Sequence, residues 1–284
     1  MNLSGSFLPT AGHVGMVQEV TLYVLFVTVI AFFGAFVFFW NARSTVLPEH
    51  RTSMTLHAII CGVAGLSYLK IWSDFQHLLQ ALAGAPSTGQ KLSLIREGYV
   101  AIGQTRYMDW TVTTPLLLLS AVLILRVRVR HVLAPVIWML LADVFMIVTG
   151  FIGENQITAN GTILQGPRLL WGGISTIGYV IAAYILFTRF RIYQRAANIE
   201  ENHAFKLMSL ATITTWGVYP IGYMIPAFFT NVNLNWIHLA FSAADIINKI
   251  GIGVIGYWAA ATVIEKLHPS QDNAAANEEH PQMD

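Results

Sequence analysis

The chain has 284 residues, of which 55% are hydrophobic and only 11% are charged, whereas a soluble domain carries about 25% charged residues. This composition predicts an integral membrane protein, and the net charge of +1 gives no reason to expect a nucleic-acid partner. The single cysteine, Cys61, excludes a disulfide within the chain, and no His/Cys cluster has the spacing of a metal site, so we expect no metal.

Seven apolar segments are each long enough to cross a membrane, because about 20 helical residues span a hydrocarbon core about 30 Å thick. In chain order they are 20–40, 54–80, 98–125, 132–153, 168–189, 206–229 and 236–264. The connections between them contain the Pro, Gly and charged residues typical of turns. The sequence therefore predicts an all-α membrane protein, a seven-transmembrane-helix bundle over residues 20–267.

The distribution of basic residues predicts the orientation of the bundle. Ten Lys and Arg residues lie near one predicted membrane face and three near the other, which places the first face in the cytoplasm. Residues 1–19 then form an extracellular segment, and they lack the basic start of a cleaved signal peptide. Residues 268–284 are polar and predict a disordered cytoplasmic tail. We expect a multi-pass protein of the cell (plasma) membrane.

Charged residues inside two of the spans are the main functional signal. The third span places Arg106, Asp109 and Thr113 on one helix face, and the seventh places Asp245 and Lys249 one turn apart. Each charge at bilayer depth costs about 2.5–3.5 kcal/mol on insertion scales. An isolated acid–amine pair could merely join helices, but four such charges need one another as partners and therefore predict a functional network.

Three stretches carry a resemblance to a known family. They are 106–117 on the third span, 216–223 on the sixth and 245–249 on the seventh. With these stretches the chain resembles the microbial rhodopsins, in particular the proton pumps of the proteorhodopsin and xanthorhodopsin branches, and it does so over all seven spans. The resemblance implies that the protein is not an enzyme but a light-driven outward proton pump in the lipid bilayer, assembled as a homo-oligomer, a trimer or a pentamer.

The same resemblance assigns roles to the charged residues. It implies that Lys249 carries all-trans retinal as a protonated Schiff base, with Asp109 and Asp245 as its counterion. Asp109 would accept the proton, and Arg106 would gate its release outward. The resemblance also implies a retinal slot, with walls formed by Trp110, Thr114, Leu117, Met146, Gly150, Ser175, Trp216, Tyr219, Tyr223 and Lys249. Flat apolar walls suit an elongated polyene.

The chain departs from the proton-pump pattern at the cytoplasmic proton donor. Related pumps carry a carboxylic acid eleven residues after the acceptor, and here that position is Ser120, which completes an Asp-Thr-Ser motif with Asp109 and Thr113. Photosensory relatives also lack this acid, so signalling through a separate transducer is the alternative function. His57 on the second span lies at the depth of Ser120, and we expect the two to be hydrogen-bonded, with His57 as donor or relay in place of the acid.

Several further residues carry smaller expectations. Leu117 matches the position that has Leu in green-absorbing relatives, so we expect green absorption. Gly172 matches the small residue beside which some relatives hold a carotenoid antenna, although close helix packing explains it as well. Asp143 is expected to bond to a neighbouring helix. Glu97 and Glu154 are expected to be solvated acids at outer helix ends, with a place in the proton-release path as the alternative.

Overall fold

The computed structural model describes residues 14–127, 129–158, 162–195, 197–229 and 232–267. Seven helical rods in this part of the chain confirm the predicted bundle. The rods are α2 (Met16–Ala42), α3 (Pro48–Gly84), α4 (Thr88–Leu123), α5 (Leu133–Glu154), α6 (Gln165–Arg189), the pair α8 (Ile199–Trp216) and α9 (Val218–Phe228), and the run α10 (Asn235–Ile246), η2 (Ile247–Gly251) and α11 (Ile252–Leu267). The short elements η1 (Val129–His131) and α7 (Arg191–Gln194) lie in connections. The predicted tail, 268–284, lies outside the described residues, as does most of the segment 1–19.

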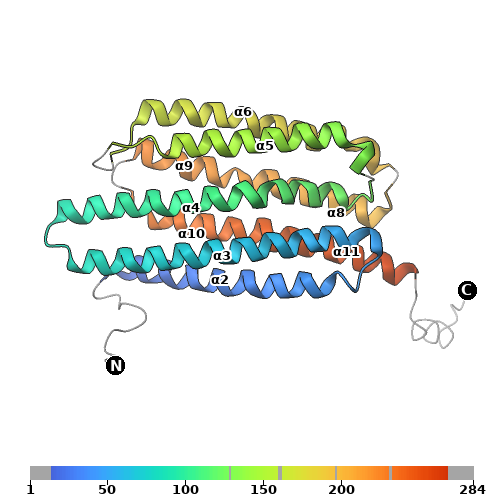
Figure 1. The fold of residues 1–284 in the computed structure, drawn as a ribbon, viewed down its shortest axis with the longest axis horizontal. Coiled ribbons are helices and arrows are strands. Elements are labelled where there is room, and N and C mark those ends of the chain that lie inside the picture. The colour runs from blue at the N-terminus through green and yellow to red at the C-terminus, as the bar shows by residue number, and fades with distance from the viewer. Residues whose placement is uncertain (1–13, 128, 159–161, 196, 230–231, 268–284) are drawn as a thin grey trace, which may run out of the picture.

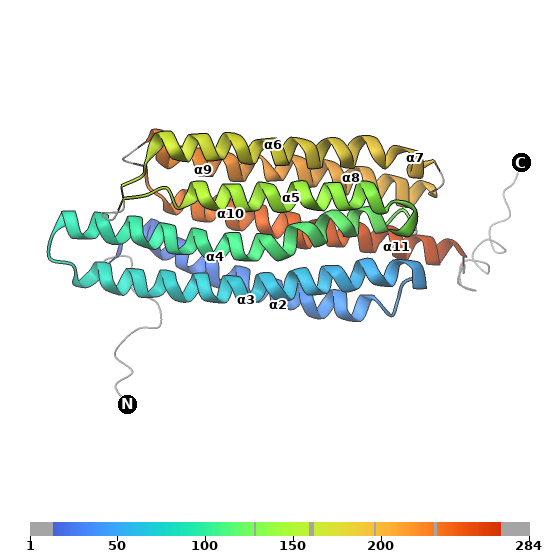
Figure 2. The same ribbon diagram turned by 45° about the horizontal axis from the view of Figure 1, so that its top comes forward.

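The rods form a closed ring in chain order. Each packs against the next, from α2 and α3 round to α11 and α8, and α10 closes the ring against α2 (Figures 1 and 2). Consecutive helices are antiparallel, as the short connections require. The ring therefore encloses one central space, toward which α4 and the α10–η2–α11 rod turn their charged residues.

The helices extend beyond the predicted spans. α3 begins at Pro48 and ends at Gly84, where residues 54–80 were expected, and α4 begins at Thr88, ten residues earlier than expected. Proline at the first helical position and the Ser87 side chain, which accepts a hydrogen bond from the Gln90 amide, start these two helices in polar sequence. Hydropathy finds the apolar part of a helix, whereas backbone hydrogen bonding continues past it.

Apolar side chains face both the inside and the outside of the ring. Large ones such as Ile137, Trp138 and Leu141 on α5 are exposed on the outer surface, as expected where lipid replaces water. Five rods of the described chain are long and apolar enough to cross a membrane. The other two, α4 and the α8–α9 pair, contain intramembrane charges or an interruption, and they complete the ring.

Two irregular backbone features position the central residues. α8 and α9 separate at Gly217, because Pro220 has no N–H to bond the carbonyl of Trp216 and its ring crowds that carbonyl. Pro115, by contrast, lies inside α4 without interrupting it. Around Lys249 the backbone adopts a π-helix, η2, a feature that is frequent at functional sites.

Candidate functional site

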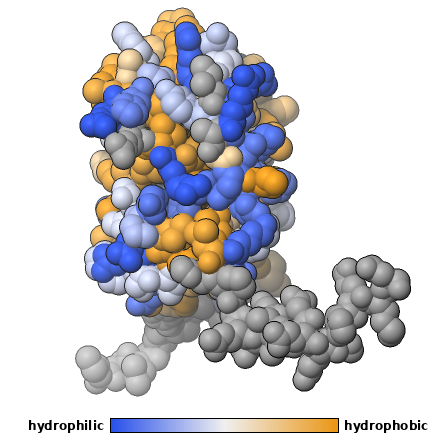
Figure 3. Space-filling view, turned by 90° about the vertical axis from the view of Figure 1, so that its right-hand side faces the viewer, coloured by the Kyte–Doolittle hydropathy of each residue, from blue (hydrophilic) through white to orange (hydrophobic). Residues whose placement is uncertain are grey.

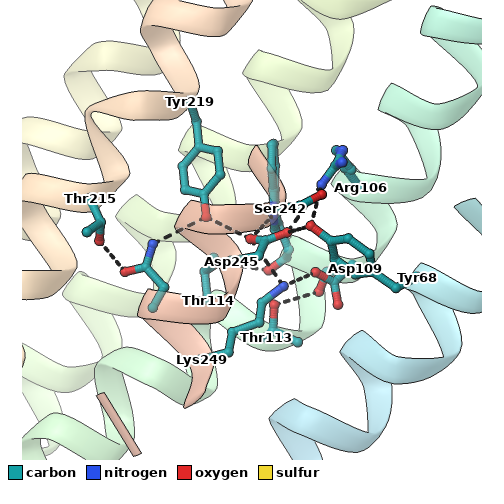
Figure 4. A network of polar contacts seen from close by, with 12 residues as sticks. Tyr68, Arg106, Asp109, Thr113, Thr114, Thr215, Tyr219, Ser242, Asp245 and Lys249 are labelled. Carbon is teal, nitrogen blue, oxygen red and sulfur yellow. Dashed lines mark hydrogen bonds and ion pairs between the residues drawn. The ribbon is translucent and has the colours of Figure 1, made fainter. Parts of the chain in front are cut away.

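Lys249 and two carboxylates meet at the centre of the ring (Figure 4). The Lys249 ammonium donates a hydrogen bond to Oδ2 of Asp109 and lies 3.4 Å from Oδ1 of Asp245. All three side chains are at most 2% exposed. The structure thus brings together charges that lie 140 residues apart in the sequence, which is the predicted network.

Asp245 is held in place by four donors. The hydroxyls of Tyr68 and Tyr219 each donate to it at 2.7 Å, the indole N–H of Trp110 at 3.4 Å, and Arg106 at 3.3 Å. Charge-assisted bonds of this kind stabilise the ionised form and fix its orientation. These four donors therefore favour the ionised form of Asp245 beside Lys249.

Asp109 is held differently. Its Oδ2 accepts from Lys249, whereas its Oδ1 is buried without a hydrogen-bond partner. Thr113 donates to the backbone carbonyl of Asp109 at 3.0 Å rather than to the carboxylate. Asp109 consequently has a free oxygen next to the Lys249 nitrogen, which is the geometry required of a proton acceptor.

Arg106 balances the charge of the cluster. Its guanidinium is 2% exposed and donates to the Tyr68 hydroxyl at 2.7 Å as well as to Asp245. Two cations and two carboxylates make the buried group neutral overall, as burial requires. The Nε and NH2 nitrogens of Arg106 have no partner, so this side chain has unused donors.

A cavity of about 200 Å³ extends from the Lys249 nitrogen between the helices. All ten residues predicted to form the slot line it. The rings of Trp110 and Tyr219 stand 4.7 Å apart at their centroids and form part of the wall. A Cβ placed at Gly150 would come within 3.1 Å of the Tyr107 ring and 3.2 Å of the Ser175 hydroxyl, so glycine keeps the α5 side of the cavity open.

Gly172 also lines the cavity. A Cβ there would lie 2.8 Å from the Tyr223 ring. The glycine thus allows the α6 backbone to approach that ring closely, which is the packing role considered for it. The expected hydrogen bond of Asp143 to a neighbouring helix is confirmed, because the Thr114 hydroxyl on α4 donates to its carboxyl group at 2.9 Å.

The expectation that Glu154 is a solvated acid is wrong. Glu154 is 3% exposed and pairs with the fully buried Arg168 at 2.7 Å. Arg168 also donates to the Tyr223 carbonyl at 3.0 and 3.2 Å. Glu154 is buried because α6 starts beside the end of α5 and directs Arg168 inward. Glu97 is exposed, as expected, and accepts a hydrogen bond from Ser93.

The expected hydrogen bond between His57 and Ser120 is not formed. The Ser120 hydroxyl donates to the Leu117 carbonyl at 2.8 Å, and it is Ser53 that reaches the Ser120 carbonyl, at 3.5 Å. His57 is fully buried, and neither of its ring nitrogens has a hydrogen-bond partner. Ser53 lies one turn before His57 on the same face of α3, so residue counting placed α3 about one helical turn out of register with α4.

Sequence reasoning missed two members of the central network. Tyr68 bonds both Asp245 and Arg106, and Asn248 bonds Tyr219 at 3.2 Å and accepts from Thr215. Asn248, a polar residue beside Lys249 in an apolar span, was a usable signal. Tyr68 was harder to find, because a tyrosine in a membrane helix is more often ordinary core.

Comparisons with known proteins show which family the chain resembles in sequence and fold. The family described as "Bacteriorhodopsin-like protein" matches residues 18–263. Archaerhodopsin-3 of Halorubrum sodomense is 28% identical over 236 residues, which cover 83% of each chain. The crystal structure of Exiguobacterium sibiricum rhodopsin is 27% identical, covers 86% of this chain and 97% of its own, and has a TM-score of 0.71. The structure of xanthorhodopsin, described as a light-driven ion pump with dual chromophore, is 27% identical, covers 88% and 96%, and has a TM-score of 0.71.

Proposed function

Because this chain belongs to the bacteriorhodopsin-like protein family, we propose that it is a light-driven pump that moves protons outward across the plasma membrane. A structural relative, xanthorhodopsin, is described as a light-driven ion pump. The observation that carries the proposal is the asymmetry of the two carboxylates: Asp245 is fixed by four donors, and Asp109 keeps one free oxygen beside Lys249.

The residues of the cavity fit retinal, the cofactor of this family. The lining of the cavity is mostly apolar and includes one amine, that of Lys249. That amine would hold the retinal aldehyde covalently, and Trp110, Trp216 and Tyr219 would hold the chain of double bonds between flat surfaces. When bound, retinal supplies the light absorption and the change of shape that start the reaction.

The protein's own residues then move the proton. Asp109 takes it from the Lys249 nitrogen, because its unpartnered Oδ1 can carry a proton without breaking an existing bond. Asp245 stays ionised under its four donors. Arg106, with two nitrogens unpartnered, can shift its bonds outward when the charge of Asp109 disappears. In this proposal the proton leaves outward past Arg106, after Asp109 has accepted it.

Further expectations belong to the same proposal. Homo-oligomer formation, as a trimer or a pentamer, and a carotenoid antenna against Gly172 both stay predictions. Photosensing is the competing function, and Ser120 favours it, because a hydroxyl bonded to Leu117 cannot supply a proton at neutral pH. A photosensor would absorb light without sustained transport, so one measurement separates the two.

The test is to illuminate an unbuffered suspension of cells containing the protein and to record external pH with and without a protonophore. We expect acidification that the protonophore abolishes. The matched control is Lys249→Ala, which removes the covalent attachment and should give neither pigment nor pH change. A coloured wild-type protein that produces no protonophore-sensitive acidification would contradict the proposal and support photosensing.

A further inference from the structure

A second buried charged cluster lies at the end of the bundle that is predicted to face the cytoplasm, where polar side chains are mixed with apolar ones (Figure 3). It consists of His50 in the first turn of α3, Glu201 in the first turn of α8, and Arg126 just after α4; we call these three residues the Glu201 cluster. The His50 and Glu201 side chains are 0% exposed, and that of Arg126 is 37% exposed. The cluster therefore connects the buried interior with water.

Glu201 is the centre of the cluster. Its Oε1 lies 2.9 Å from Nε2 of His50 and 2.7 Å from Nε of Arg126, and its Oε2 accepts the Asn198 backbone N–H at 3.3 Å. Burial raises the pKa of Glu201, but the hydrogen bond from His50 and the charge of Arg126 outweigh burial and hold the pKa below its ordinary value of 4.5. The neighbouring Glu200 pairs instead with Lys266 on α11. Glu201 is thus ionised at neutral pH.

The backbone of Arg126 is strained at this point. Its φ of 53° is the only positive φ of a non-glycine residue in the described chain. Side chains with a Cβ avoid this left-handed region, and such residues persist where surrounding contacts hold them, often at functional sites. Here the strain places the guanidinium on Glu201.

Unpartnered nitrogens continue inward from the cluster along one face of α3. His50, Ser53 and His57 are spaced i, i+3, i+7, and all three are buried. Nδ1 of His50 and both ring nitrogens of His57 lack hydrogen-bond partners, although buried polar atoms almost always have one. His57 lies near the inner end of this face, where its Nδ1 is 2.8 Å from the position that a Cβ would take at Gly253, just after η2. Seven helical residues span about 10.5 Å, a distance that two or three water molecules can bridge.

We propose that His50, held by Glu201, is the proton-uptake site of the cytoplasmic half, from which protons pass along the α3 face to His57. This inference rests on the proposed pumping function. As imidazolium, His50 bonds Glu201 through its Nε2–H and carries a second proton on Nδ1. It donates the Nδ1 proton inward and becomes neutral, and a proton from cytoplasmic water then restores the imidazolium. Glu201 stays ionised and holds the His50 ring by its Nε2–H. The pair would thus supply the proton that Ser120 cannot.

Flash spectroscopy tests the proposal. After a flash, the rate at which visible absorption recovers reports the return of a proton to Lys249. We expect His50→Gln and Glu201→Gln to slow this recovery by at least about tenfold, and added azide, a small proton carrier, to restore it. Glu200→Gln, one residue away, is the matched control and should recover at the wild-type rate. Proton release to the outside, recorded with a pH dye, should keep its rate in all variants, which shows that they are folded.

An infrared titration of the retinal-free protein gives a second readout. The carboxylate band that Glu201→Gln removes should titrate at higher pH in His50→Leu than in the unchanged protein, because leucine has no donor to replace the hydrogen bond that lowers the pKa of Glu201. If the wild type pumps and both His50→Gln and Glu201→Gln recover their absorption at the wild-type rate, the proposed uptake site is wrong and the proposed function stands. Absence of pumping in the wild type would instead refute the proposed function.

Discussion

At the scale of single residues, Asp109 and Asp245 are chemically identical side chains that differ in the number of hydrogen-bond donors around them. Asp245 accepts bonds from two tyrosines, a tryptophan and an arginine, and Asp109 accepts one bond at its carboxylate, from Lys249. A group that must gain and lose a proton needs few competing donors, whereas a fixed charge needs many. The number of donors at each carboxylate depends on which helices face it.

The first prediction separates these roles. Asp109→Asn keeps the shape of the site but cannot accept a proton, so light-driven acidification should fall at least about tenfold while pigment still forms. Asp245→Asn leaves Arg106 and Lys249 with an uncompensated buried charge, which should destabilise the pigment by roughly 3–5 kcal/mol. The measurements are external pH under illumination and thermal bleaching. Normal pumping by Asp109→Asn would contradict the assignment.

The second residue-scale prediction concerns colour. Leu117 is 1% exposed and lines the cavity with an apolar side chain. With no added dipole at this position, the pigment should absorb green light, and Leu117→Gln should shift the maximum toward the blue. Absorption spectra of the two purified pigments at neutral pH provide the check, and a blue-absorbing wild type would contradict the prediction.

At the scale of elements, a glycine allows α5 and α6 to pack closely. A Cβ at Gly178 would lie 2.6 Å from the Ala142 carbonyl oxygen and 2.9 Å from the Met146 amide nitrogen. Both atoms belong to the α5 backbone, so no side-chain rotation relieves the contact. Small residues at such crossings are the usual means by which membrane helices pack tightly.

Gly178→Ala should therefore force α5 and α6 apart and destabilise the pigment by about 1–3 kcal/mol, the usual cost of overpacking. Gly173→Ala, on the same helix, is the matched control, because nothing lies within 4 Å of its Cβ position. Thermal bleaching of both variants gives the difference. Equal stability of the two would show that α5 and α6 can separate without cost.

Contacts between helices differ in how well the sequence predicts them. Charged side chains in apolar spans pair with one another, because the bilayer offers them no other partner. The sequence could therefore predict the contacts among Arg106, Asp109, Asp245 and Lys249. The contacts of His57 were not predictable, because counting residues does not fix how far one helix is shifted along its neighbour, and Ser53, four residues earlier on the same face of α3, is the residue that reaches Ser120. The burial of Glu154 was not predictable either, because it depends on the path of the connection between α5 and α6.

At the scale of the whole molecule, the central charges lie between two buried acid–base groups. Glu154 and Arg168 occupy one end of the ring, and the Glu201 cluster occupies the other. The Glu201 cluster joins α3 to α8, and Arg168 joins α6 to Glu154 on α5 and to the Tyr223 carbonyl on α9. Each group stands between the centre and one surface. A transport protein that opens alternately to its two sides needs a separate barrier at each end, and these two groups lie where such barriers are needed.

The last prediction tests the closure at the Glu154 end. Arg168 is 0% exposed, and Glu154 is its one carboxylate partner in the described chain. Glu154→Gln leaves a buried guanidinium with only carbonyl acceptors, so we expect a loss of about 3–5 kcal/mol in pigment stability. Replacing both partners, as Glu154→Gln with Arg168→Met, removes the unpaired charge and should recover much of that loss, although the Tyr223 carbonyl loses its donors. Thermal bleaching of the single and double variants in lipid measures both effects. If the double variant is no more stable than the single one, Arg168 contributes through the Tyr223 carbonyl rather than through Glu154, and the ion pair is not what closes this end.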